Sequence, residues 1–541
     1  MTRARVRLAR RVAATALLCA ALNVVAAQAS GATRQAPAYD LVITGGTVVD
    51  GSGAPRRRAD VAVAGDRIVA VAPRVDASRA RRVIDATGLV VAPGFIDNHA
   101  HLVTLDAHPL AENFVRQGIT TIMATLHSQD QPWPIDAYAA RVRMAPNVGL
   151  FAGHTWIRKR VMGLANRAAT SRELDWMQAL VDSAMQQGAL GLASGLEYVP
   201  ASFAKTDEVV ALARVAARYG GTYATHMRDE GVHLVEAVDE ALQVGREAAI
   251  PVLINHHKVT GAAQFGWSAR SLSRIDRAVA AGQRVAHDLY PYMAFSTYSD
   301  LMFPAWALAD GPAEFARRVA DTPTRERLVR EMRVIFPEQA GPGPESIQFR
   351  EMVAEPALQG KTLADYLRAR HEPPTIERAI EALIRLQLAG GFIGIFHAMD
   401  ERDVTRIMRH PLAMFETDGD LIELDKGFPH PRSLGAFPRV LSRYVRELHV
   451  LTLEQAIMKM TSQAARWWGQ GDRGLVATGK LADIVVFDAR TVTDQGGYTD
   501  PNHYPVGITT VIVNGIAVFE EGKMTGEKPG RFLVRPPVAS R

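Results

Sequence analysis

Cysteine is the scarcest residue in this chain, because Cys19 is the only one among 541 residues. Cys19 falls inside a predicted secretion signal, so the mature protein has no thiol. Without a thiol it can form no disulfide and can offer no cysteine to a metal. The softest protein ligand for zinc is therefore excluded, and a metal site has to use histidine and carboxylate side chains.

Long apolar runs are also missing, with one exception near the N-terminus. Several arginines precede an apolar run over residues 12–27, and the run ends in Ala27-Gln28-Ala29, with small residues at 27 and 29. This order is typical of a secretory signal, so we expect residues 1–29 to be a signal peptide of the ordinary secretory path. The alternative is a transmembrane anchor, for which the run is short against the ~20 residues of a membrane span. The sequence thus predicts a periplasmic or secreted protein that is not inserted in the membrane after signal cleavage.

The chain has no large excess of one charge. It carries 62 Lys and Arg against 57 Asp and Glu, and the excess of five equals the number of arginines in the predicted signal. These are Arg3, Arg5, Arg7, Arg10 and Arg11. A neutral mature protein gives no support to a nucleic-acid partner or an anionic membrane surface. The composition does not determine an oligomeric state.

The order of apolar patterns predicts an α/β protein with two parts. Short β-branched runs at residues 39–93 return at 471–535, which predicts a small β-sandwich domain formed from both chain ends. Between them, over 94–470, strand-like runs alternate with amphipathic helix patterns, as in a (β/α)8 TIM-like barrel. A Pro- and Arg-rich stretch at about 299–388 does not fit one βα unit. We expect it to be an insertion that lies over the barrel mouth.

Nine candidate strands compete for the eight places in the barrel, so one of them is false or extra. The candidates end at Asp97, Leu126, Gly153, Ser194, Thr225, Asn255, His287, Phe396 and Thr417. Active-site groups of such barrels lie at the carboxyl ends of the strands, so polar residues just past these runs are the candidates for chemistry.

Four histidines and one aspartate stand at these positions. His99 and His101 follow the first run, and their two-residue spacing places both imidazoles on one face of a strand, where they can bind one metal. His226 and His256 each close a further strand. Asp418 follows the last run, and a carboxylate there can bind a metal and accept the proton of the attacking water. The pattern indicates a metal-dependent hydrolase.

Several longer motifs resemble those of one family. They are Pro-Gly-Phe-Ile-Asp at 93–97, His-Met-Arg-Asp-Glu at 226–230, Asn-His-His-Lys at 255–258, Tyr-Pro-Tyr at 290–292 and Gly-Lys-Leu-Ala-Asp-Ile-Val at 479–485. In this order they are similar to the N-acyl-D-amino-acid deacylases, or D-aminoacylases, of the amidohydrolase superfamily. The likeness covers nearly all of the chain after the predicted signal.

The resemblance implies zinc-dependent hydrolysis of the amide bond of an N-acyl-D-amino acid, which gives a carboxylate and a free D-amino acid. It implies one or two zinc ions and a small N-acylated amino acid as the partner. The implied roles are metal ligand for His99, His101, His226 and His256, general acid/base for Asp418, and substrate binding for Lys258, Arg432, Tyr198 and Tyr290. A fixed pair of cations makes physical sense, since it holds the α-carboxylate and orients the scissile amide.

One position departs from the family pattern. His127 stands where these deacylases usually carry a metal-binding cysteine, at the end of the second strand. A thiolate can bridge two metals, whereas a neutral imidazole offers one lone pair, so the exchange argues against a bridged pair of metals. His127 is predicted either to join His226 and His256 as a zinc ligand or to hydrogen-bond the substrate or the water. In the first case we expect His99 and His101 to bind a looser ion.

Two other functions fit parts of the sequence. A secreted amidohydrolase with the same site could act on dipeptides or cyclic amides. A binding or scaffold protein on a decayed barrel would be expected to lack ligands, but the four histidines and Asp418 are all present.

Overall fold

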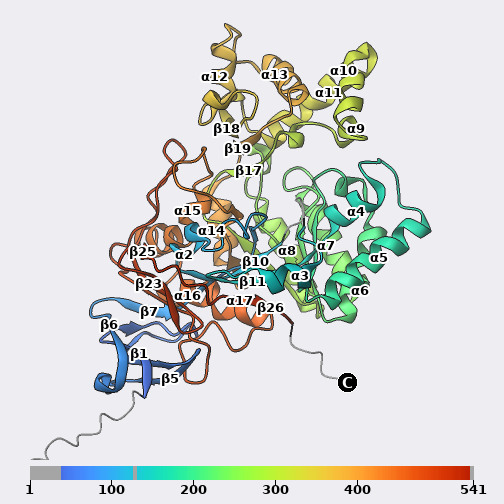
Figure 1. The fold of residues 1–541 in the computed structure, drawn as a ribbon. Coiled ribbons are helices and arrows are strands. Elements are labelled where there is room, and N and C mark those ends of the chain that lie inside the picture. The colour runs from blue at the N-terminus through green and yellow to red at the C-terminus, as the bar shows by residue number, and fades with distance from the viewer. Residues whose placement is uncertain (1–37, 126–130, 536–541) are drawn as a thin grey trace, which may run out of the picture.

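The computed structural model describes residues 38–125 and 131–535, and it contains a barrel, a β-sandwich and an inserted domain (Figure 1). The predicted signal peptide, residues 1–29, lies outside the described residues. Across the described ranges, no helix is both long enough and apolar enough to cross a bilayer.

Two sheets form the sandwich, and both chain ends contribute to it. One sheet has the order β5-β4-β1-β6 and comes from the N-terminal part alone; the other has the order β25-β24-β23-β22-β7-β2-β3. Their bounds are β1 Tyr39–Thr44, β2 Thr47–Val48, β3 Arg57–Arg58, β4 Asp60–Ala64, β5 Arg67–Ala72, β6 Ala80–Asp85, β7 Val90–Pro93, β22 Ile484–Phe487, β23 Ile508–Val513, β24 Ile516–Glu520 and β25 Lys523–Met524. Leu41 and Val61 of the first sheet pack against Val91, Ile484 and Ile512 of the second. The predicted composite sandwich is confirmed.

Eight parallel strand positions form the barrel wall in the part of the chain that the structure describes. They are β8 Phe95–Asp97, β10 Ile119–Ala124, β11 Asn147–Leu150 continued by β12 Ala152–Gly153, β13 Gly191–Gly195, β14 Thr222–His226, β15 Val252–Ile254, β16 Val285–Leu289 and β20 Ala413–Phe415. The wall closes between β20 and β8, where the amide of Asn98 donates to the carbonyl of Phe415 at 3.4 Å. Two short strands, β9 Ala100–His101 and β21 Gly419–Asp420, extend this junction as a parallel pair.

Helices connect these strands and cover the barrel. Their bounds are α2 Glu112–Val115, α3 Ile135–Arg141, α4 His154–Met162, α5 Ser171–Gln186, α6 Thr206–Arg218, α7 Leu234–Ala248, α8 Ser268–Ala280, α14 Glu401–Arg409, α15 Arg432–Arg439, α16 Leu453–Met460 and α17 Ser462–Trp467, with a π-helix at Val440–Glu447. The longer ones bury one face, as α6 does with Val209, Leu212 and Val215. This is the amphipathic pattern on which the barrel prediction rests.

Alternate residues of the strands build layers inside the barrel. Ile96, Met123, Ala224, Leu253 and Met414 belong to one buried apolar cluster. Two residues further along their strands stand polar or ionisable side chains, because strand residues two apart share a face. These are Asn98, Thr125, His226, Asn255 and Glu416, and all five are buried. An apolar floor thus lies below a polar layer at the carboxyl ends of the strands.

The inserted domain interrupts the chain after β16. It contains the antiparallel strands β17 Phe295–Tyr298, β18 Ile347–Glu351 and β19 Ile393–Phe396, in the order β17-β19-β18. Its helices are α9 Ala305–Leu308, α10 Pro312–Ala320, α11 Thr322–Gln339, α12 Leu363–Arg368 and α13 Ile376–Leu388. Figure 1 shows this domain standing beyond one end of the barrel.

Two boundaries differ from the sequence prediction. The ninth candidate strand, which ends at Phe396, pairs with β17 and β18, so it is the extra one and the insertion is longer than the predicted 299–388. A continuous apolar run alone does not reveal whether its partner strand is local or in the barrel. At the other end of the chain, β26 Phe532–Leu533 pairs with the barrel strand β11, so the predicted sandwich segment 471–535 ends on the barrel wall.

Candidate metal centre

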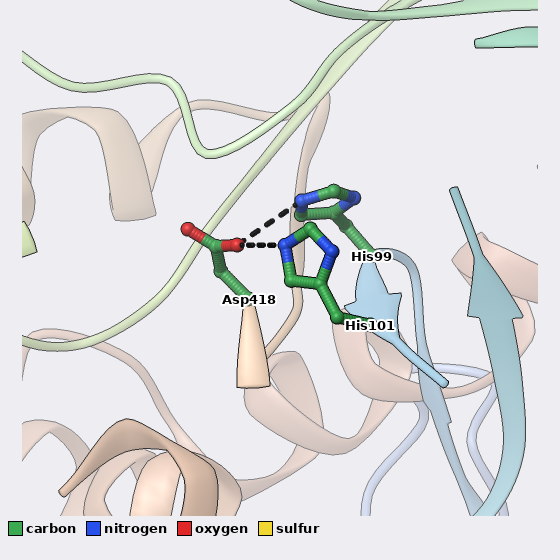
Figure 2. Close-up of side chains that lie close together, drawn as sticks. All are labelled: His99, His101 and Asp418. Atoms are coloured by element: carbon green, nitrogen blue, oxygen red, sulfur yellow. Dashed lines mark hydrogen bonds and ion pairs between the residues drawn. The ribbon is translucent and has the colours of Figure 1, made fainter. Parts of the chain in front are cut away.

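The first group of candidate ligands lies where the barrel closes (Figure 2). The Nε2 atoms of His99 and His101 lie 3.2 and 3.0 Å from the same oxygen of Asp418, Oδ1. His99 follows β8, His101 ends β9, and Asp418 follows β20, so three strand ends bring the group together. Oδ2 of Asp418 pairs with Nη1 of Arg432 at 2.8 Å. Two imidazoles and a carboxylate of this kind could hold a metal ion.

The second group lies beside the first. Nδ1 of His226 is 2.8 Å from Nε2 of His256, and the centres of the two rings are 4.4 Å apart. The ring of His99 lies 5.2 Å from that of His256. The four histidines that the sequence singled out therefore form one cluster at the carboxyl ends of the strands.

The backbone is unusual at two of these residues. His256 and Asp418 have positive φ angles, 35° and 45°, which residues with a side chain rarely adopt. The amide of Asp418 donates to the carbonyl of His99 at 3.0 Å, and the amide of His256 donates to Oδ1 of Asp288 at 2.5 Å. Such conformations gather at functional sites, where the surrounding structure holds them in place.

Two carboxylates that the sequence reasoning gave no role contact these histidines. Oε2 of Glu197 is 2.7 Å from Nε2 of His226, and Oε1 of Glu230 is 3.0 Å from Nδ1 of His256. Glu230 together with His226 and His256 could in principle hold a metal. However, the ammonium group of Lys258 lies on that side, 2.5 Å from Oε2 of Glu230 and 2.8 Å from Nδ1 of His256. The ammonium would repel a metal there, so the side on which Nδ1 of His226 faces Nε2 of His256 suits a metal better.

The four predicted substrate-binding residues surround this cluster. The ring of Tyr290 lies 4.8 Å from the guanidinium of Arg432 and 5.8 Å from the ammonium of Lys258. The ring of Tyr198 lies 4.6 Å from that of His226, and its hydroxyl accepts a hydrogen bond from Thr297 at 3.0 Å. Two cations and two phenols thus stand next to the candidate ligands.

Burial and neighbouring charges set the protonation states of the candidate ligands. Burial lowers the pKa of both His99 and His226 to about 4 and that of His256 well below its usual value, so these imidazoles are neutral and offer lone pairs. Burial alone would raise the pKa of Asp418, but Arg432 and the hydrogen bonds of His101 and His99 hold it well below the usual range. Neutral imidazoles and an ionised carboxylate are the forms in which these groups bind metal.

The centre opens into a hollow between the barrel and the inserted domain. His101, Tyr198, His226, Asp418 and Arg432 line its inner part. Further out it continues into a cavity of about 460 Å³. Both parts also contact Tyr298 and Arg350, which lie on strands of the inserted domain. Arg350 pairs with Asp420 of the barrel, so the insertion forms one wall of the entrance, as its predicted place over the mouth implies.

His127, the predicted third ligand or hydrogen-bond donor, lies outside the described residues. Its role stays a prediction. The residues that sequence reasoning missed are Glu197, Glu230 and Thr125, the last of which contacts Nδ1 of His99. Glu230 stands four residues after His226, and Glu197 precedes Tyr198. No sequence pattern at either position indicates a role in the site.

The barrel and its cluster of imidazoles and carboxylates define a metal-dependent hydrolase, and comparisons with known proteins agree. Residues 82–519 match the amidohydrolase family. The chain is 37% identical over 527 residues to the D-aminoacylase of Alcaligenes xylosoxydans xylosoxydans. The aligned region covers 92% of this chain and 98% of that relative.

Two solved structures are similar over the same extent. One is a D-aminoacylase with a binuclear metal centre, 35% identical, with a TM-score of 0.77, covering 92% of this chain and 100% of that chain. The other is the N-acyl-D-glutamate deacylase of Bordetella bronchiseptica in complex with zinc and a phosphonate inhibitor, 33% identical, with a TM-score of 0.77, covering 92% and 99%. This chain belongs to the amidohydrolase family, in its D-aminoacylase branch, and is a hydrolase of non-peptide C–N bonds.

Proposed function

We propose that the protein uses zinc to hydrolyse the amide bond of N-acyl-D-amino acids. The observation that carries this proposal is the placement of two buried cations, Lys258 and Arg432, beside the cluster of candidate ligands. A substrate whose carboxylate binds these cations places its amide against the histidines and Asp418. The relatives named for N-acyl-D-amino acids support the same substrate class.

The donor set fits zinc, because it consists of imidazole nitrogens and a carboxylate oxygen. His226 and His256, with His127 as the predicted third ligand, would hold the essential ion. His99, His101 and Asp418 would hold a second, weaker one. When bound, zinc supplies Lewis acidity toward the scissile carbonyl and the attacking water.

The protein's own groups would do the remaining work. Asp418 is kept ionised by Arg432 and by two imidazoles, so its Oδ1 can accept the proton of the attacking water and deliver it to the leaving nitrogen. Lys258 and Arg432 would bind the α-carboxylate, with Tyr198 and Tyr290 beside them. The entrance wall from the inserted domain would limit the access of bulk water.

The site of action is also a proposal. The sequence order of residues 1–29, with arginines, an apolar run and small residues, supports export to the periplasm or the exterior. Zinc proteins without thiols suit an oxidising compartment, since no ligand can be lost to a disulfide.

A panel of amides tests the proposed substrate class. We expect kcat/KM for an N-acetyl-D-amino acid to exceed that for the matching carboxamide, whose carboxylate is blocked, by at least about 100-fold, because the charge-assisted bonds to Lys258 and Arg432 are lost. Cyclic amides without a free α-carboxylate should be poorer substrates by a similar factor. A cyclic amide or a dipeptide that is turned over fastest would replace the proposed substrate.

A further inference from the structure

We propose that Glu197 is a positioning residue of the metal centre: it accepts the hydrogen of Nε2 of His226, so that Nδ1 of the same ring is left to bind the ion. The inference rests on the proposed zinc site and goes beyond its ligand set. A carboxylate on the far nitrogen of a ligating histidine fixes the ring and its tautomer and makes the ring a stronger ligand.

The fold places Glu197 beside His226 through backbone contacts. Strands β13 and β14 pair in parallel, and Gly195 lies opposite His226 in their register. Just past this pair, the amide of Leu196 donates to the carbonyl of His226 at 3.1 Å. The chain then turns, since the amide of Tyr198 donates to the carbonyl of Gly195 at 3.1 Å. The position of Glu197 is therefore set by the barrel itself and not by a free loop.

The opposite nitrogen of His226 faces the candidate metal position. Nε2 lies 2.7 Å from Glu197, whereas Nδ1 lies 2.8 Å from Nε2 of His256. His256 differs, because its Nδ1 faces both Glu230 and the ammonium of Lys258, while its Nε2 faces His226. His226 thus turns Nε2 to a carboxylate and Nδ1 to the point that it shares with His256.

In the described part of the chain, Glu197 is not paired directly with a lysine or arginine, and Lys258 attracts its charge only from further away. The Glu197 side chain is 11% exposed, and among the residues that the structure describes no lysine or arginine lies within ion-pair distance of it. Burying a carboxylate without a directly paired cation is costly. A divalent cation on the other side of the His226 ring would compensate this charge.

The buried pair of Glu208 and His154 provides a comparison with Glu197 and His226. Oε1 of Glu208 lies 3.0 Å from Nε2 of His154, but Glu208 also pairs with the guanidinium of Arg158. Burial alone would raise the pKa of Glu208, but the hydrogen bonds and charges of His154 and Arg158 outweigh it and lower this pKa. The charge of Glu208 is neutralised by the protein, whereas that of Glu197 is available to a bound metal.

The carboxylate of Glu197 also matters because no cysteine thiolate is present among the candidate ligands. The described barrel has no cysteine, so its imidazole ligands bring no negative charge of their own. Glu197 supplies such a charge from across the imidazole ring of His226, whereas the charge of Glu230 is paired with Lys258. Glu197 would thereby strengthen the binding of zinc by neutral histidines.

The test is the zinc affinity of the mature full-length chain and its variants, measured by competition with a chromophoric chelator. Glu197→Gln keeps the size of the side chain and one acceptor but removes the charge, and Glu197→Ala removes both. We expect zinc to bind about 10- to 100-fold more weakly to the alanine variant, with a smaller loss in the glutamine variant.

Glu208→Gln is the matched control, since it changes a buried carboxylate on a histidine outside the centre; its zinc affinity should equal that of the wild type. Unchanged affinity in folded Glu197→Gln and Glu197→Ala proteins would overturn the inference, and so would an equal loss in Glu208→Gln. If the alanine variant fails to fold, the glutamine variant decides alone. Wild-type protein that binds no zinc would instead refute the proposed function.

Discussion

Replacing Asp418 by asparagine is expected to lower kcat by about 10²- to 10⁴-fold, the usual contribution of a general acid/base. The carboxylate contacts His99 and His101 through one oxygen and Arg432 through the other. Asparagine keeps the size of the side chain but cannot accept the proton of the attacking water. Steady-state kinetics on an N-acetyl-D-amino acid, with the zinc content of each preparation determined by mass spectrometry, measures the effect.

The matched control is Asp276→Asn, because the Asp276 side chain is 65% exposed and pairs with His410, outside the cluster of candidate ligands. This variant should keep the wild-type kcat. If Asp418→Asn retains most of its activity while binding the normal amount of zinc, another group must carry the proton and the assignment of Asp418 is wrong.

Removing the metal is expected to reduce kcat/KM by more than about 1,000-fold, because Lewis acidity contributes several kcal/mol to such reactions. Dialysis against a chelator followed by assay in metal-free buffer gives the first value. One equivalent of zinc should restore most of the activity, since the site of His226 and His256 is proposed to fill first. Magnesium should restore little, because it prefers oxygen ligands.

Removal of the metal and stepwise addition of zinc, repeated with variants, separate the two candidate subsites. His256→Ala should lose the tightly bound ion and the activity together, whereas His101→Ala should lose the weaker ion and keep the tight one. Activity that survives in protein free of detectable metal would contradict the metal dependence. Tight binding that persists in His256→Ala would place the essential ion with His99 and His101.

The sequence predicted the barrel and the candidate ligands because both leave local signals. Each candidate ligand follows an apolar run, and in a parallel barrel all such positions meet at one end. His226 and His256 are 30 residues apart in the chain, yet their nearest ring nitrogens are 2.8 Å apart. This closeness follows from the neighbouring strands β14 and β15.

The residues around the ligands could not be predicted in this way. Glu197 becomes visible only when the register of β13 and β14 brings it beside His226. Arg350 comes from the inserted domain, 70 residues away in the chain from Asp420, its partner on the barrel. The apolar run that ends at Phe396 looks like a barrel strand, and only its antiparallel partners assign it to the insertion.

Hydrolysis of the two mirror-image substrates tests the central claim most directly. Purified zinc-loaded protein is incubated with a racemic N-acetyl amino acid, and chiral chromatography follows the release of each free amino acid. The account predicts that the D form is released at least about 100-fold faster, a difference of about 2.7 kcal/mol between the two transition states. Equal rates, or faster release of the L form, would contradict it.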